Sequence, residues 1–230
     1  MRLPGFRGPF WRVFPWNPAA APGEPFTPEY VLPAGVQTGG RFDLGDAPTL
    51  YLALDDPAHA VAEVLQDLRG RRELRAGHLR RRMRGTPGVH IPLALVPTWV
   101  EAEVYDALPD LGDPCMLARL GIRPDDLCSR DRATTQAISR ALHDEHGLPG
   151  FRWWSAFRGE WHVAVLFMGR VGSGGLRCGR PDPLHLHHPI VHAAAAELHL
   201  RVLRADGAHG TRRARGSSAL VPSTPPRDLS

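Results

Sequence analysis

Short apolar runs and helical periodicities alternate along this 230-residue chain, with turn residues between them. The run 49–54 (TLYLAL) has the length and the apolar or aromatic character of a buried strand. Asp55-Asp56-Pro57 follows it and predicts a helix start, with Asp56 as N-cap and Pro57 at the first helical position. Apolar residues then recur at helical spacing, at Ala58, Val61, Ala62, Leu65 and Leu68.

The same pattern predicts further elements on both sides of this stretch. We expect strands over 10–14 and 89–96, a helix over 131–146, a hairpin made of 151–154 and 162–168, and a helix that begins at Pro189. There is no βαβ regularity and no glycine-rich phosphate loop. The pattern therefore favours an α+β fold with a central mixed or antiparallel sheet and peripheral helices.

Polar residues of different chemistry stand on successive elements of this framework. Arg41 follows a glycine pair, Tyr51 lies in the predicted strand 49–54, and Glu63 lies on the helix beside its apolar stripe. We therefore expect the Glu63 carboxylate at the edge of the core, where a cleft could open. Ser155 ends the first arm of the predicted hairpin, in GFRWWSAFRGEWHVAVLF.

In this order, Arg41 in GGRF, Tyr51 in LYLAL, Glu63 in AVAEVL and Ser155 in the hairpin resemble a RES domain, a family named for its arginine, glutamate and serine. The resemblance covers most of the chain and implies a single ADP-ribosyltransferase-like domain over residues 1–205. It also implies an NAD-degrading enzyme that is the toxin of a bacterial toxin-antitoxin pair, with a partner antitoxin of the Xre type. By composition, residues 206–230 are predicted to form a disordered tail.

The resemblance gives each site residue an expected role, with NAD consumed as substrate and no separate cofactor. Glu63 would stabilise the oxocarbenium-like ribose, and Ser155 would orient Glu63 or the substrate. Arg41 would bind a phosphate or the oxygens of the dinucleotide, and Tyr51 would offer an aromatic face to nicotinamide. Arg12, in the first strand, is a further candidate for NAD binding.

Each of these residues also has an ordinary structural explanation. Tyr51 fits a core aromatic residue, Ser155 a hairpin polar residue, and Arg41 with Glu63 an ordinary ion pair. We expect Arg41, Tyr51, Glu63 and Ser155 to converge on one concave pocket, with Ser155 or Arg41 bonded to Glu63. Asp43 departs from the family pattern, which frequently has asparagine there, and His162 has no partner evident in the sequence.

The sequence leaves the acceptor of the reaction open. Water would give hydrolysis, inorganic phosphate would give phosphorolysis, and a protein side chain would give ADP-ribosylation. A competing function of a different class is a basic module without catalysis, which docks RNA or a protein partner through Arg69–Arg84.

The net charge of +4 permits that alternative, because the arginines are concentrated in one run. Eight of them occur against the single Glu73, namely Arg69, Arg71, Arg72, Arg75, Arg80, Arg81, Arg82 and Arg84. A solvated helix end explains such a run as well as a binding patch does. No aromatic residue interleaves the arginines as a base-stacking platform requires, so direct nucleic-acid binding is not favoured.

The remaining signals concern compartment and metals. Three widely spaced cysteines favour a reducing, cytoplasmic setting, and no signal peptide or membrane span is evident. His185, His187, His188 and His192 cluster near the C-terminus, and the last two have the spacing of ligands on one helical face. They complete no recognisable ligand pattern, so we predict no metal site.

Overall fold

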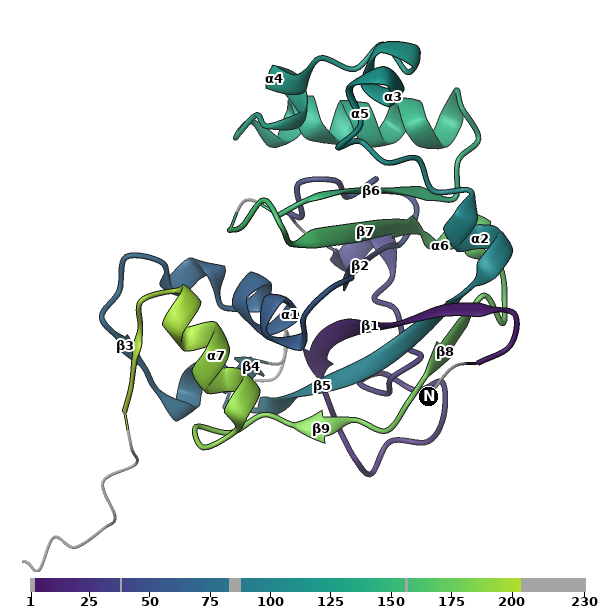
Figure 1. The fold of residues 1–230 in the computed structure, drawn as a ribbon. Helices are drawn as coiled ribbons and strands as arrows, with labels where there is room; N and C mark the ends of the chain where they lie inside the picture. Colours follow the sequence, from purple (N-terminus) through teal and green to yellow (C-terminus); the bar gives the residue numbers. More distant parts are fainter. Residues whose placement is uncertain (1–2, 38, 83–87, 156, 204–230) are drawn as a thin grey trace, which may run out of the picture.

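A large antiparallel sheet organises the computed structural model, which describes residues 3–37, 39–82, 88–155 and 157–203. Its path runs β4-β5-β1-β2-β7-β6, with β8 and β9 also paired to β5 (Figure 1). The strands are β1 (Phe6–Pro15), β2 (Thr49–Ala53), β4 (Arg80–Arg82), β5 (His90–Glu101), β6 (Gly150–Trp154), β7 (His162–Phe167), β8 (Leu176–Cys178) and β9 (Asp182–Pro183). Every pairing in it is antiparallel, and the predicted α+β fold is confirmed.

Helices and a small second sheet surround this sheet. The α-helices are α1 (Pro57–Val64), α2 (Ala102–Asp106), α3 (Pro114–Arg119), α4 (Pro124–Leu127), α5 (Arg132–Asp144), α6 (Met168–Val171) and α7 (Pro189–Glu197). Three short 3-10 helices are η1 (Ala34–Val36), η2 (Gln66–Leu68) and η3 (Ala76–Leu79). Strands β3 (Glu73–Leu74) and β10 (Arg201–Val202) form a separate parallel pair.

The predicted start of α1 is confirmed, and its cause is local. The Asp56 side chain accepts a hydrogen bond from the Ala58 amide at 2.7 Å, and Pro57 occupies the first turn, where its missing N–H is not needed. Asp131 caps α5 in the same way. The predicted hairpin also forms, as β6 paired with β7.

Two groups of helices cover one face of the sheet. The register pairs Trp11 with Ala53, so Trp11, Ala53 and Tyr51 share that face, while Arg12 points to the other. Helices α1 and α7 pack over β1 and β5 in one apolar cluster, and α3, α4 and α5 pack over β6 and β7 in another (Figure 1). Strand β2 lies between the two groups and carries Tyr51 there.

The arginine run is arranged differently from the helix end that one interpretation expected. Helix α1 ends at Val64, before the first of these arginines. The run then passes through turns, β3, η3 and β4, so its side chains do not share one helical face. Arg84 and the predicted tail 206–230 lie outside the described residues. Within the described part of the chain, no helix is both long and apolar enough to span a bilayer.

Candidate active site

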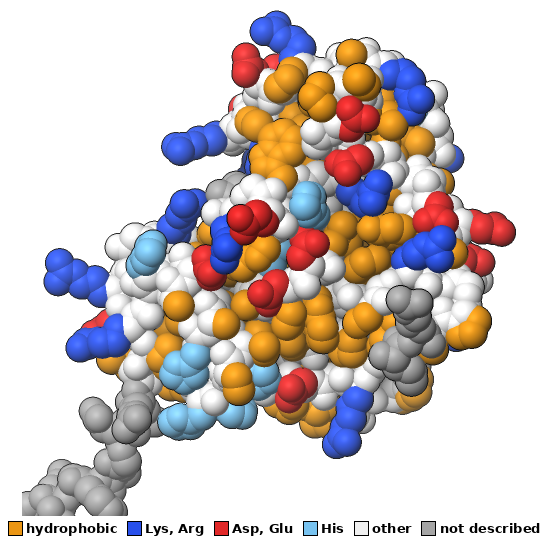
Figure 2. All heavy atoms as spheres, viewed as in Figure 1, with side chains coloured by type: hydrophobic (Ala, Val, Ile, Leu, Met, Phe, Trp, Pro, Cys, Tyr) orange, Lys and Arg blue, Asp and Glu red, His pale blue; other side chains and the backbone are white. Residues whose placement is uncertain are grey.

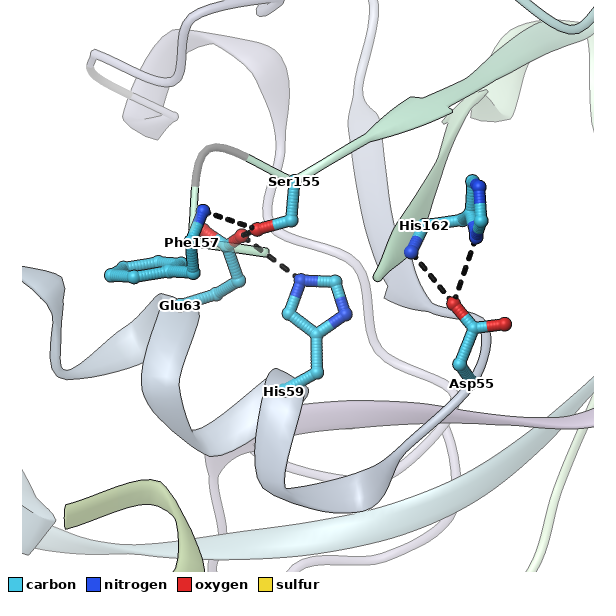
Figure 3. A network of polar contacts seen from close by, with 6 residues as sticks. All are labelled: Asp55, His59, Glu63, Ser155, Phe157 and His162. Atoms are coloured by element: carbon cyan, nitrogen blue, oxygen red, sulfur yellow. Dashed lines mark hydrogen bonds and ion pairs between the residues drawn. The ribbon is translucent and has the colours of Figure 1, made fainter. Parts of the chain in front are cut away.

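Glu63 stands at the centre of a hydrogen-bonded group between α1 and the β6–β7 hairpin. Ser155 Oγ donates to Glu63 Oε1 at 2.7 Å, although the two residues are 92 positions apart. Nε2 of His59 lies 3.0 Å from the same oxygen (Figure 3). The expectation that Ser155 or Arg41 would bond to Glu63 is therefore confirmed for Ser155.

Ser155 is held so that its hydroxyl proton is directed at the carboxylate. Its side-chain oxygen accepts from the Phe157 amide at 3.1 Å, which leaves the proton free for Glu63. Its own amide donates to the Trp161 carbonyl at 2.6 Å and closes the hairpin end. Ser155 is buried, whereas 33% of the Glu63 side chain is exposed. The carboxylate is thus fixed from the protein side and still open to a ligand.

His59 is the site residue that the sequence analysis missed. It lies one helical turn before Glu63, is completely buried, and stacks on Trp161 with ring centroids 4.7 Å apart. The sequence did contain a signal for this contact, because His59 and Glu63 are four residues apart and residues at i and i+4 share a helix face. It was hidden by the apolar residues around His59, which suggested an ordinary core position.

Asp55 ties the start of α1 to the start of β7. Its Oδ2 accepts from the His162 amide at 2.6 Å and lies 3.1 Å from Nδ1 of the same histidine (Figure 3). His162 thus has a partner that the sequence did not reveal. This clamp joins the helix that carries Glu63 to the hairpin that carries Ser155.

Arg41 lies near Glu63 without a direct ion pair between them among the described contacts. Its Nη2 donates to the carbonyls of Leu127 and Ser129, at 2.7 and 3.2 Å, and its guanidinium lies 4.7 Å from the ring centroid of Trp153. Burial lowers the pKa of Arg41, and nearby acidic groups, including the Glu63 carboxylate, oppose that shift. Arg41 therefore combines a structural role with a charge close to the site.

Tyr51 is anchored through Asp43. Its hydroxyl donates to Asp43 Oδ1 at 2.8 Å, while Asp43 Oδ2 accepts from the Gly40 amide at 2.7 Å. Burial, followed by the Asp43 charge, raises the pKa of Tyr51 well above its usual value. A Cβ on Gly40 would clash with the Asp43 carboxylate and the Tyr51 hydroxyl, which explains the glycine at this position. Asp43, the departure from the family pattern, thus orients Tyr51.

Arg12 is not brought to this group. Its guanidinium donates to the carbonyls of Pro28 and Tyr30, at 2.9 and 2.8 Å, on the sheet face opposite Tyr51. Burial lowers its pKa, and the groups that oppose this shift are Cys178 and Glu29. The structure thus shows Arg12 anchoring the loop after β1, and its role as a candidate for NAD binding stays a prediction.

Of the four candidates that we expected to converge, Glu63 and Ser155 are joined by a direct hydrogen bond. Arg41, in the segment before β2, lies near both Glu63 and Tyr51, whereas Tyr51 has no described contact with Glu63 or Ser155. A cavity of about 340 Å³ is lined by Gly39 and Asp43 and by the α5 residues Gln136 and Arg140. Its lining does not include Glu63, so the single pocket expected for all four residues is not found among the described cavities.

Within the histidine cluster near the C-terminus, His188 has a structural role. His188 precedes α7 as its N-cap, where Nδ1 accepts from the Ile190 amide at 3.1 Å and Nε2 lies 3.0 Å from Asp182. His188 and His192 therefore do not form a pair of ligands on one helical face. Among the described residues, no group of three or more His, Cys, Asp or Glu side chains is placed to hold a metal ion.

Comparisons with known proteins place this geometry in context. No match was found among curated proteins. The fold is similar to that of a chain in the crystal structure of the M. tuberculosis MbcT-MbcA toxin-antitoxin complex, with a TM-score of 0.50 and 18% sequence identity over 83% of this chain and 87% of that one. The RES domain family matches residues 9–178, a span that includes Arg41, Tyr51, Glu63 and Ser155. This span is well over half of the chain, and the chain therefore belongs to the RES domain family.

Proposed function

We propose that this protein cleaves the nicotinamide-ribose N-glycosidic bond of NAD, by hydrolysis or phosphorolysis. The observation that carries the proposal is the Glu63 carboxylate, which accepts from Ser155 at 2.7 Å and lies 3.0 Å from His59 while a third of its side chain stays exposed. A carboxylate fixed on one side and open on the other can meet a cationic reaction centre. RES family membership supports the same reaction.

The proposed chemistry needs an anion near the ribose. When the bond between ribose C1′ and the ring nitrogen breaks, its electron pair goes to nicotinamide and discharges the positive ring. Positive charge develops at C1′, and the Glu63 carboxylate stabilises it. An oxygen of water or phosphate then forms the new bond at C1′, and the proton of that oxygen is released.

Arg41 and Tyr51 are proposed to hold the substrate. Nη2 of Arg41 is bonded to two carbonyls, whereas Nη1 has no partner among the described hydrogen bonds. A guanidinium with a free edge suits an anionic phosphate or a ribose oxygen of NAD. The Tyr51 ring, held through its hydroxyl by Asp43, is the proposed surface for nicotinamide.

We also propose that the protein is the toxin of a toxin-antitoxin pair. The similar fold in M. tuberculosis was solved in a toxin-antitoxin complex, and this supports an antitoxin partner here. Loss of NAD would account for toxicity, and a protein that covers Glu63 would suppress it. The Xre type of antitoxin is the partner that the family resemblance implies.

The test is to incubate the purified protein with NAD, with and without inorganic phosphate, and to identify the ribose-side product by mass spectrometry. ADP-ribose in both conditions indicates hydrolysis, and a phosphorylated ADP-ribose only with phosphate indicates phosphorolysis. ADP-ribose attached to protein would favour the transferase alternative. Unchanged NAD in every condition, from protein that is folded by circular dichroism, would overturn the proposal.

A further inference from the structure

We infer that His59 is a positioning residue that fixes which oxygen of Glu63 faces the substrate. It bonds Oε1 together with Ser155, so that Oε2 is left for the reaction. The inference rests on the proposed function and deepens it, because it gives the two carboxylate oxygens different roles. Oε1 is held by the protein, and Oε2 faces the substrate. Trp161 contributes to the same positioning, since it contacts both His59 and Ser155.

The His59 ring that contacts Glu63 is shielded from water. The His59 side chain is 0% exposed, and its Nε2 lies 3.0 Å from Glu63 Oε1. No water reaches the buried His59 ring to compete for this hydrogen bond, so the bond is stronger than an equivalent one between two exposed side chains. Because the two residues are one turn apart on α1, the helix itself sets their separation.

The surroundings of the ring determine which nitrogen carries the proton. An ionised carboxylate only accepts hydrogen bonds, so Nε2 of His59 must be the donor to Glu63. Nδ1 is buried and has no partner among the described residues. A second proton on Nδ1 would be an unsatisfied buried donor, which is costly. The geometry thus assigns the neutral ring with its proton on Nε2, which leaves the negative charge of Glu63 available to the substrate.

Trp161 aligns both donors at once. Its ring stacks on His59 at a centroid distance of 4.7 Å and an interplanar angle of 21°, which fixes the plane of the imidazole. Its carbonyl accepts from the Ser155 amide at 2.6 Å, which fixes the end of β6. The guanidinium of Arg158 also lies over the Trp161 ring, 5.4 Å from the centroid. Trp161 therefore fixes both donors to Glu63, His59 through its indole ring and Ser155 through its backbone carbonyl.

The two donors make the carboxylate asymmetric. Both reach Oε1, and Oε2 has no partner among the described hydrogen bonds. Since 33% of the Glu63 side chain is exposed, the unbonded oxygen is the one that a ligand can approach. Rotation of the carboxylate would break both bonds, so His59 and Ser155 together keep Oε2 directed to the substrate.

The first test is independent of NAD turnover. In protein labelled with ¹⁵N-histidine, the ring of His59 should show the neutral tautomer protonated on Nε2 at pH 7, and Glu63→Gln should shift its Nε2 proton signal upfield because a neutral acceptor bonds more weakly. A doubly protonated ring, a proton on Nδ1, or a signal unaffected by Glu63→Gln would overturn the inference.

The second test compares two substitutions of His59. His59→Phe retains a stacking ring without a donor and should lower kcat by roughly 10- to 100-fold, as expected for loss of a hydrogen bond to a charged group. KM should change little, because the substrate does not touch His59. His59→Gln restores a donor and should recover at least part of kcat. His192→Phe, at an exposed position on α7, is the matched control and should retain full activity.

The outcomes separate this inference from the proposed function. Unchanged kcat in His59→Phe, or no gain of His59→Gln over His59→Phe when both are folded by thermal unfolding, would overturn the positioning role. If the wild-type protein leaves NAD intact, the proposed function fails, and the ¹⁵N spectra alone then decide whether His59 orients Glu63.

Discussion

The segment around Glu63 and the arginine run that follows it are adjacent in sequence, but they differ in the burial and the contacts of their side chains. Glu63 contacts two buried side chains, and its group involves segments as far apart as α1 and the β6–β7 hairpin. The described arginines of this run are exposed, and their described hydrogen-bond acceptors are glutamate or backbone oxygens, while Arg69 lies over the Phe157 ring. For example, Arg75 bonds Glu73 at 2.8 Å and Arg81 bonds the Val64 carbonyl at 2.9 Å.

The difference shows that a concentration of charge in the sequence does not by itself produce a defined arrangement of side chains. Exposed charges are solvated and screened, so each contributes little to a defined geometry. Figure 2 shows basic side chains around β3 that project into solvent singly, without merging into one continuous patch on this face. A single carboxylate with two buried partners has far fewer orientations open to it and is better suited to a chemical step.

The largest effect should come from Glu63→Gln. We expect it to lower NAD turnover by ~10²-fold or more, because the amide cannot stabilise positive charge at the ribose as a carboxylate does. Circular dichroism and thermal unfolding should show an unchanged fold. Glu145→Gln, at an exposed position after α5, is the control. Full turnover by Glu63→Gln would show that the Glu63 carboxylate matters no more for turnover than the exposed arginines do.

Arg41→Lys should come next, with a loss in kcat/KM of roughly 20-fold. Lysine keeps the positive charge but lacks the planar fork that now binds the carbonyls of Leu127 and Ser129. The defect should appear mainly in KM, measured by initial rates over a range of NAD concentrations. Arg119→Lys is the exposed control, and equal kinetics for both variants would show that only the charge matters.

Ser155→Ala should cost roughly tenfold in kcat, because one of two donors to Glu63 Oε1 is lost and the other remains. The double variant with His59→Phe should fall further than either single variant. Ser173→Ala, at an exposed position, provides the control. A wild-type rate for Ser155→Ala would mean that this serine has no part in orienting the carboxylate.

The smallest effect should follow from replacing Arg80, Arg81 and Arg82 together by glutamine. NAD turnover should stay within about threefold of wild type, because these side chains are exposed and make no contact with the Glu63 group. If the protein were instead a basic RNA-binding module, the triple variant would lose RNA binding, and binding by the wild type would fall steeply with salt. A filter-binding assay at two salt concentrations distinguishes these results.

The sequence predicted the elements and their chemistry well where the signals are local. The N-cap Asp56, the helix after it and the β6–β7 hairpin depend on neighbouring residues, and all three are confirmed. The contact between Glu63 and Ser155 was predicted from the resemblance and from the cost of an unpaired carboxylate, and spacing alone could not have given it.

The unpredicted features depend on tertiary packing. His59 was hidden in an apolar helix face, and its role appears only once Trp161 stacks on it. Arg12 was a further candidate for NAD binding, and the pairing of Trp11 with Ala53 places it on the sheet face opposite Tyr51, which the sequence did not predict. A shift of one residue in strand register would reverse that result, and single-sequence patterns do not fix register to that accuracy.

The clamp formed by Asp55 has a consequence for the entropy of the reaction. Because Asp55 holds both the amide and the ring of His162, the start of α1 and the start of β7 are joined before any substrate binds. In the proposed reaction, the conformational entropy lost in bringing Glu63 to Ser155 is thus lost once, during folding, and not again in each cycle. Substrate binding has only the ligand itself to immobilise against a carboxylate that is already in place.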